Sequence, residues 1–230
     1  MDTANKANGW TKGRALLAGG LVLGLGAAAT LAAWTDNEWV FGGSGNGDGT
    51  EPGTPGTGIY KMEQNTWTGT AGAASWVDEP DANGGALTFT LQPERMIPGK
   101  TVYSPLQLRA AAGSEALDVS LAEGIQSAPN RGTDNSTDLY NALRYGLYKG
   151  VDKAACEAGT VSGGVTVVGG NSVLTATSAT TFPLAAGADA ATAGAPENLC
   201  FALTLPSTAS ADLQGLNTVP VWRFTSSVGQ

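Results

Sequence analysis

The sequence predicts an all-β protein whose main domain is a jelly-roll-like antiparallel β-sandwich, and three observations support this. From residue 59 onward, short runs of alternating apolar and polar residues follow one another. Turn-forming residues separate the runs, as at Asn83-Gly84-Gly85. Only one short stretch has a helical pattern. Alternation with a period of two is typical of strands with one buried face, and many short strands with such spacing are typical of sandwiches and jelly rolls.

Eight runs are predicted to be strands. In one of them, Leu87 and Phe89 point to one side while Thr88 points to the other. Pro105 lies inside another run and predicts a sheet edge or a bulge there, because proline donates no ladder hydrogen bond. The eight runs are residues 59–64, 86–91, 101–111, 117–122, 143–149, 164–168, 199–205 and 218–225.

Two further segments complete the predicted domain. Residues 136–143 begin with cap-type residues and are predicted to form one or two helical turns. Residues 174–195 are rich in Ala and Thr, and we expect a long loop there around Phe182 and Leu184.

The N-terminal residues 1–33 are predicted to be a secretory signal peptide. Lys6, Lys12 and Arg14 precede an uncharged, apolar stretch at 15–33 that ends in small residues. A basic head, an apolar stretch and small residues at its end are the three parts of such a segment. The alternative is a retained membrane anchor, since the stretch is about as long as the roughly 20 residues that span a bilayer. We therefore expect a secreted or cell-surface protein with no membrane contact beyond an uncleaved signal segment.

The next 25 residues, 34–58, are predicted to be a short strand followed by a linker. Residues 34–41 are aromatic and β-prone. Residues 42–58 are almost entirely Gly, Pro, Ser, Thr and Asn, a composition that cannot bury a core. The β-sandwich domain is expected to occupy the remaining residues, 59–230.

The two cysteines, Cys156 and Cys200, are predicted to form a disulfide. An even, small number of cysteines in an exported chain favours pairing. The alternative is a pair of unpaired, buried thiols.

Charge and composition exclude several classes of function. Without residues 1–33, which hold three of twelve basic and one of twenty acidic residues, the chain has a net charge of −10. Such a chain lacks the basic face that binds nucleic acid or anionic lipid. It contains no histidine, which removes His-based catalytic triads and zinc sites. We expect no enzymatic activity and no cofactor.

Carboxylates are the remaining route to catalysis. Asp78, Glu79 and Asp81 cluster beside turn-forming residues, and Asp134 and Asp138 form a second group. Both are best interpreted as polar turns. The alternative is an acid/base pair of a hydrolase or a calcium site.

Other surface features allow a binding function. Trp67 and Trp76, with Tyr60 nearby, would stack on a glycan or a partner protein if exposed, although such aromatics more often fill a core. The triplet beginning at Asn135 matches an N-glycosylation acceptor, a pattern that is common by chance.

The sequence around the predicted cleavage site resembles a known family. The segment 24–39 contains an Ala-Ala pair followed by an aromatic residue, Thr and Asp, as Ala32-Ala33-Trp34-Thr35-Asp36. This is similar to exported proteins of Gram-positive bacteria that are processed by the SipW type of signal peptidase, in an actinobacterial branch; relatives include TasA and camelysin. The resemblance extends through residues 98–114, 143–148, 198–206 and 221–225.

The resemblance implies cleavage between Ala33 and Trp34 by a dedicated signal peptidase. It also implies a jelly-roll-like sandwich at the cell surface or in a biofilm matrix, where subunits form fibres when the N-terminal strand of one completes the sheet of the next. Residues 34–41 fit this role, since an unpaired strand edge is satisfied by a neighbour's backbone. Two features depart from the family: the Gly/Pro linker at 42–58 replaces a compact strand region, and the metallopeptidase activity assigned to camelysin has no histidine ligands here.

Overall fold

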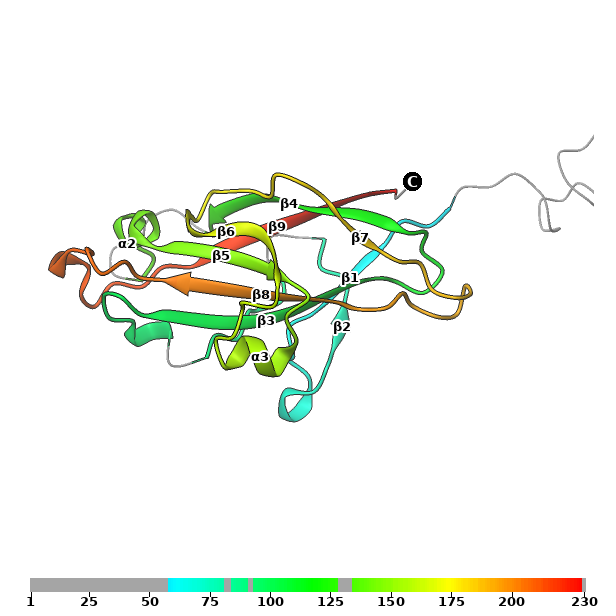
Figure 1. Ribbon diagram of the computed structural model, residues 1–230, viewed down its shortest axis with the longest axis horizontal. Coiled ribbons are helices and arrows are strands. Elements are labelled where there is room, and N and C mark those ends of the chain that lie inside the picture. Colours follow the sequence, from blue (N-terminus) through cyan, green and yellow to red (C-terminus); the bar gives the residue numbers. More distant parts are fainter. Residues whose placement is uncertain (1–57, 81–83, 91–92, 128–133, 229–230) are drawn as a thin grey trace, which may run out of the picture. The chain divides into compact units, whose positions relative to one another are not determined.

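The computed structural model describes residues 58–80, 84–90, 93–127 and 134–228 (Figure 1). The predicted signal peptide, the Ala33–Trp34 cleavage site, the segment 34–41 and the linker up to residue 57 lie outside the described residues. All the helices and strands below belong to one compact unit that begins at Thr57.

The described residues form two antiparallel sheets, which confirms the predicted all-β sandwich. Six strands have the order β2-β1-β3-β8-β5-β6, and three have the order β7-β4-β9. The strands are β1 (Met62–Asn65), β2 (Trp76–Val77), β3 (Thr101–Ala110), β4 (Leu117–Gln126), β5 (Arg144–Lys149), β6 (Val165–Val173), β7 (Phe182–Leu184), β8 (Glu197–Thr204) and β9 (Pro220–Val228). Figure 1 shows β4 and β9 in one layer and β3, β8 and β5 in the other.

The chain alternates between the two sheets as it proceeds. It runs from β3 to β4, back to β5 and β6, then through β7 to β8 and finally to β9. This wrapping is the jelly-roll-like character that the strand pattern predicts. It places β8 between β3 and β5 and leaves β9 at the end of the smaller sheet.

Period-two alternation in β3 explains how the core is built. Val102, Leu106 and Leu108 are buried between the sheets, whereas Gln107 and Arg109 lie on the outer face. Burial of one such aliphatic side chain stabilises a fold by about 1.5–3 kcal/mol. Side chains from β4, β5, β7 and β8 complete the core in the same way: Leu117, Val119, Leu121, Tyr145, Leu147, Phe182, Leu184, Leu199, Phe201 and Leu203.

Most of the predicted strands exist, with shifted ends, and one prediction is wrong. Residues 84–90 alternate between exposed and half-buried positions, but they pair with no strand in the described part of the chain. Two strands were not predicted: β2, and β7 inside the segment expected to be a loop. Pro105 lies in β3, which is an internal strand. Strand β1 pairs with β3 only between Ala110 and Gln107, so the ladder with β1 ends before it reaches Pro105. At the proline, β3 is therefore locally an edge.

The two α-helices in the described part of the chain are explained by their caps. Helix α2 (Thr137–Ala142) was predicted, and its N-cap Ser136 accepts a hydrogen bond from the Leu139 N–H. Helix α3 (Lys153–Glu157) begins after Asp152, whose side chain accepts from the Ala155 N–H at 2.8 Å. No helix in the described ranges is long and apolar enough to cross a membrane.

The predicted disulfide is present. Cys156 of α3 is bonded to Cys200 of β8, with 5.6 Å between their Cα atoms. Both residues are fully buried in a small cluster with Val151, on the outer side of the six-stranded sheet. The bond fixes α3 against β8 and closes a loop with a sequence separation of 44. A disulfide of this kind is compatible with an extracellular protein.

A close backbone approach occurs in β4. A Cβ atom added at Gly124 would lie 1.9 Å from the carbonyl oxygen of Leu174. Only glycine therefore allows the chain after β6 to cross this strand. The crossing lies next to the register shift between Leu121 and Glu123, where β4 pairs with β9.

Candidate functional site: an open strand edge beside an apolar cleft

Four strands lie at sheet edges, and three of them are poorly suited to pair with another chain. Among the described residues, β2 has only two residues, β7 has three with a central Pro183, and β6 contains Gly169-Gly170 and two register shifts against β5. Short strands, prolines and bulges all blunt an edge. Strand β9 is nine residues long, as β6 is, but it contains no glycine and has only one register shift against β4, which pairs with it on one side only. The edge of β9 is thus the one long edge in this part of the chain that is suited to accept a further strand.

The open edge of β9 borders a large cleft. The cleft has a volume of about 1700 Å³ and is lined by β9 and by strands β1, β3 and β8 of the facing sheet. It follows from the sheet sizes, because three strands face six and leave part of the larger sheet without a facing strand. The apolar side chains at its base include Leu106, Leu108, Phe201 and Leu203, which are only 1–5% exposed, and the half-buried Trp222.

The rim of the cleft carries exposed apolar side chains among charged ones, which include Lys61, Glu79, Glu94 and Arg95. Tyr60 and Ile97 are 55% and 58% exposed, and Ile125 and Val219 are also exposed. All four line the cleft, so half of the eight exposed large apolar side chains among the described residues lie there. Exposed apolar side chains that gather in this way mark interaction surfaces more often than scattered ones do.

The segment 84–90 contributes to the cleft without closing it. Leu87 and Phe89 pack against the core and line the cleft. The Thr90 N–H donates to the Tyr103 carbonyl at 2.8 Å, which ties one end of the segment to β3. Because residues 84–90 form no ladder with β9, they leave its edge open.

Aromatic contacts hold β9 at the cleft. The ring centroid of Trp222 lies 4.8 Å from that of Phe201 and 5.4 Å from that of Tyr145. Phe224 meets Phe201 edge-on at 6.4 Å. Such pairs contribute about 0.5–1.5 kcal/mol each beyond their buried area. They fix β9 against β8 and β5 and so keep its far edge in a constant position.

Burial changes the titration of the tyrosines next to these rings. Burial raises the pKa of Tyr145 well above that of a free tyrosine, and the nearby Tyr140 raises it further. Burial also raises the pKa of Tyr140. The Tyr145 hydroxyl donates to the Ala176 carbonyl, so the neutral phenol is the form that the core accommodates.

A polar network fixes the start of β9. The Asn135 Oδ1 atom accepts from Gln126 Nε2 at 2.9 Å and from the Val219 N–H at 3.0 Å. Thr137 donates from its hydroxyl to Gln126 Oε1 at 3.0 Å. Asn135 is only 3% exposed, so its amide is not accessible for glycosylation in the folded domain. The sequence pattern singled out Asn135 for a modification, whereas the structure gives it a structural role.

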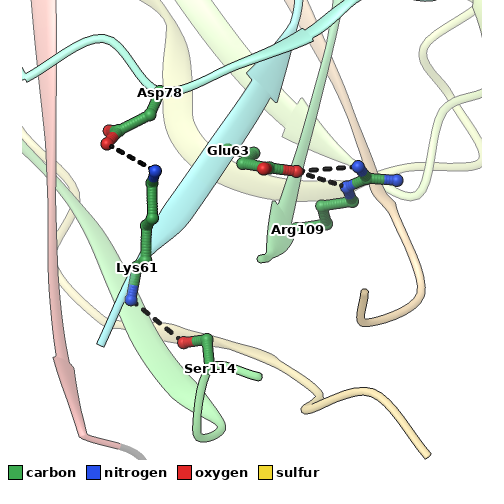
Figure 2. Close-up of polar contacts among 5 residues, drawn as sticks. All are labelled: Lys61, Glu63, Asp78, Arg109 and Ser114. Carbon is green, nitrogen blue, oxygen red and sulfur yellow. Dashed lines mark hydrogen bonds and ion pairs between the residues drawn. The ribbon is translucent and has the colours of Figure 1, made fainter. Parts of the chain in front are cut away.

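The structure describes two members of the predicted carboxylate cluster, Asp78 and Glu79. Figure 2 shows Asp78 ion-paired with Lys61, with 3.2 Å between Oδ2 and Nζ. Glu79 is exposed, and Asp81 lies outside the described residues. Of the second group, Asp134 is exposed, while Asp138 lies in the first turn of α2. No three His, Cys, Asp or Glu side chains in the described ranges gather as metal ligands.

A second ion pair joins β1 and β3 on the outer face of the six-stranded sheet. Arg109 donates from Nε and Nη2 to one Glu63 oxygen, at 2.9 and 2.7 Å (Figure 2). The guanidinium group also lies over the Trp76 ring, 4.0 Å from its centroid. Arginine suits this position because its planar group stacks on an aromatic face while it binds a carboxylate.

The two tryptophans that were candidates for glycan stacking are half-buried, and neither belongs to the main core. Lys153 Nζ lies 5.5 Å from the centroid of the Trp67 ring. The Arg109 guanidinium group lies 4.0 Å from the centroid of the Trp76 ring. One face of each ring therefore already carries a cation. These contacts hold the β1–β2 loop against the sheet and against α3.

A row of amides explains why this loop is so firmly held. Asn65 Nδ2 donates to Gln107 Oε1 at 2.8 Å, and Gln107 Nε2 donates to Asn198 Oδ1 at 2.7 Å. Asn65 Oδ1 accepts the backbone N–H groups of Trp67 and Ser75. Asn65 is fully buried, so this one side chain joins both ends of the loop to β3.

Comparisons with known proteins add no assignment. No protein-family model matches the chain, and no curated protein matches it significantly. The family resemblance described from the sequence therefore stays a prediction.

Proposed function

We propose that the protein is an exported structural protein of the cell envelope or biofilm matrix, and that it is a fibre subunit. In this proposal, residues 34–41 of one copy pair with the open edge of β9 in the next. The observation that carries it is the long edge of β9, with which no further strand pairs among the described residues, beside a cleft with an apolar base. Export through the signal peptide at 1–33 and cleavage by a dedicated signal peptidase would precede assembly.

The segment 34–41 matches this acceptor in length and pattern. It has eight residues, and β9 has nine. In an extended segment, Trp39 and Phe41 point to the same side, while Asp36 and Glu38 point to the other. The rings of Trp39 and Phe41 would enter the cleft, and the two carboxylates would remain in water on the side that also carries Trp34 and Val40. Backbone hydrogen bonds to β9 would provide affinity, and the cleft would provide specificity.

Cleavage at Ala33–Trp34 would control when pairing begins. Before cleavage, the segment directly follows the apolar stretch 15–33. After cleavage, Trp34 is the first residue, and the segment is attached to the domain only through the linker. Processing would therefore release the strand that assembly needs.

The test compares assembly of the chain that begins at Trp34 with that of a chain lacking residues 34–41, followed by light scattering and electron microscopy. We expect fibres from the first and none from the second. A charge at the cleft rim, Ile125→Glu, is expected to weaken assembly. The matched control is Val165→Glu, which places the same charge on the exposed edge of β6. Undiminished polymerisation without residues 34–41 would overturn the proposal.

The two alternative functions have no comparable observation in their favour. Stacking of a glycan on Trp67 or Trp76 has to compete with the cations already on these rings. For a carboxylate-dependent hydrolase, the described residues add only an exposed ion pair between Asp78 and Lys61 to the pattern seen in the sequence.

A further inference from the structure

The backbone of β9 presents alternate residues to its open edge. Leu121 of β4 points away from β9, because its N–H donates to Ser178 Oγ and its carbonyl accepts the Ser178 N–H, both at 3.0 Å. Phe224 lies opposite Leu121, and opposite residues of an antiparallel ladder either bond to each other or both point away. The N–H and C=O groups of Phe224, and of Trp222 and Ser226 two residues to either side, therefore point to the open edge.

The segment 84–90 runs along β3 on the other side of the cleft. At one end, the Thr90 N–H donates to the Tyr103 carbonyl at 2.8 Å. At the other end, a Cβ atom added at Gly85 would lie 2.9 Å from Gln64 Nε2, so this end lies beside β1. Because β1 pairs with the C-terminal end of β3, the segment runs antiparallel to β3.

Pro105 explains why this segment forms no ladder with β3. Hydrogen-bonded pairs in an antiparallel ladder recur at every second residue, so the pair after Thr90 and Tyr103 is Thr88 and Pro105. Pro105 has no N–H to donate. The segment keeps the alternating exposure of a strand, yet its single backbone–backbone bond within the described ranges is that of Thr90. Residues 84–90 are thus an extended chain that still lacks a partner strand.

The far edge of this segment faces away from β3. The N–H groups of successive residues in an extended chain point to opposite sides, so those of Leu87 and Phe89 point away from β3. Both residues line the cleft, as Trp222 and Phe224 of β9 do. Among the described residues, two strand edges without a partner therefore border one cleft, and each belongs to a different layer of the sandwich.

We propose that the partner of this site is an extended polypeptide strand that inserts between β9 and residues 84–90 and is hydrogen-bonded on both sides. This inference rests on the proposed function for one point, that an added strand pairs with β9. It adds the second edge. Residues 84–90 complete their own ladder only when the inserted strand is present, and the sandwich closes on this side.

Two physical arguments favour a strand over another ligand. Paired strands lie about 4.8 Å apart, so an inserted strand separates its two neighbours by about 9.6 Å, close to the roughly 10 Å between packed sheets. Backbone donors and acceptors repeated along both edges are matched by another polypeptide backbone. The side chains of the inserted strand that face the cleft base would meet Leu108 and Phe201, so apolar residues are expected at these alternate positions.

Amide hydrogen exchange, resolved by residue, tests the two-sided pairing. The measurement compares the chain that begins at Trp34 as a dilute monomer and after assembly. On assembly we expect about tenfold slower exchange at Leu87 and Phe89 as well as at Phe224. Thr88, whose N–H faces β3, should change by less than about twofold. Protection of Phe224 without protection of Leu87 and Phe89 would overturn the inference and leave the proposed function standing.

Proline substitutions test the second edge separately. Leu87→Pro removes the N–H that would face the inserted strand, whereas Leu87→Ala removes side-chain contacts and keeps that N–H. We expect the proline variant to need about three- to tenfold more protein for assembly than the alanine variant. The matched control Thr88→Pro is expected to leave this threshold unchanged, and exchange in β8 shows whether each variant keeps the fold. Equal thresholds for the two Leu87 variants would overturn the inference.

The outcomes separate the two proposals. If the chain without residues 34–41 assembles and protects Leu87, Phe89 and Phe224 in the same way, the proposed donor is wrong and the two-sided site stands. If the assembled protein protects none of these three residues, β9 is not the acceptor, and the inference and the proposed function are both wrong. The same holds if the complete chain does not assemble.

Discussion

Replacement of both cysteines by alanine is expected to lower the free energy of unfolding by about 4 kcal/mol. The Cys156–Cys200 bond closes a loop with a sequence separation of 44. In the chain-entropy model, a loop of this length restricts the unfolded chain by about 13 cal/mol/K, which corresponds to about 4 kcal/mol at 25 °C. Domains of this kind have a total stability of about 5–15 kcal/mol. The change is therefore a large fraction of the total, and corresponds to a fall in melting temperature of about 8–16 °C.

The assay is urea denaturation of the chain that begins at Trp34, followed by tryptophan fluorescence. The denaturant dependence of the free energy should increase in the Cys156→Ala/Cys200→Ala variant, because its unfolded chain is less compact. The control is the unmodified chain, unfolded and refolded with a reducing agent, which loses the bond but keeps both sulfur atoms. A loss below about 1 kcal/mol, or an unchanged denaturant dependence, would refute the reasoning that the bond acts by restricting the unfolded chain.

Three further substitutions test other parts of the structure by the same unfolding assay. Asn65→Ala is expected to lower the free energy of unfolding by about 2–4 kcal/mol, because it leaves two backbone N–H groups of the β1–β2 loop without their acceptor. The control Asn198→Ala, at the outer end of the same amide row, should lower it by about 1 kcal/mol. Equal losses would contradict the role given to the buried Asn65. Gly124→Ala is expected to cost about 3 kcal/mol because its Cβ would overlap a neighbouring backbone, whereas Gly163→Ala, with no atom near the new Cβ, should change stability by less than about 0.5 kcal/mol. Burial raises the pKa of Tyr145, so the tyrosine of the unfolded state ionises first and the free energy of unfolding falls as the pH rises above about 10. Tyr145→Phe should reduce the slope of this free energy against pH by up to about 1.4 kcal/mol per pH unit. An unchanged slope would assign the loss of stability to other groups.

The sequence was sufficient to predict the fold class because most strands carry a local signal. Alternation in β3 and β4 reflects burial mainly on one face, which each run shows by itself, whereas Leu199–Leu203 of β8 are buried on both faces. The disulfide was predictable because the chain has only two cysteines and a predicted signal peptide. The same reasoning failed for residues 84–90, since the strand pattern of Leu87 and Phe89 records a buried face but not whether a partner strand is available.

The candidate site was not predictable, because it depends on the order of the strands. The run at 218–225 resembles the other strand patterns, and nothing in it shows that β9 ends a sheet. The cleft brings together Tyr60, Leu108, Phe201 and Trp222, which are far apart in the sequence. The roles of Asn135 and Arg109 likewise depend on contacts with distant residues. The N-terminal segment was singled out by its own composition, but its acceptor required the structure.

Hydrogen–deuterium exchange tests most directly whether β9 is the acceptor edge. The measurement uses the chain without residues 34–41 and adds a synthetic peptide with the sequence of those residues. We predict that the peptide slows exchange in β9 and in the residues that line the cleft, while exchange at the edge strands β2 and β6 is unchanged. No change in β9, or protection that appears at β6 instead, would contradict the assignment of β9 as the edge that residues 34–41 complete.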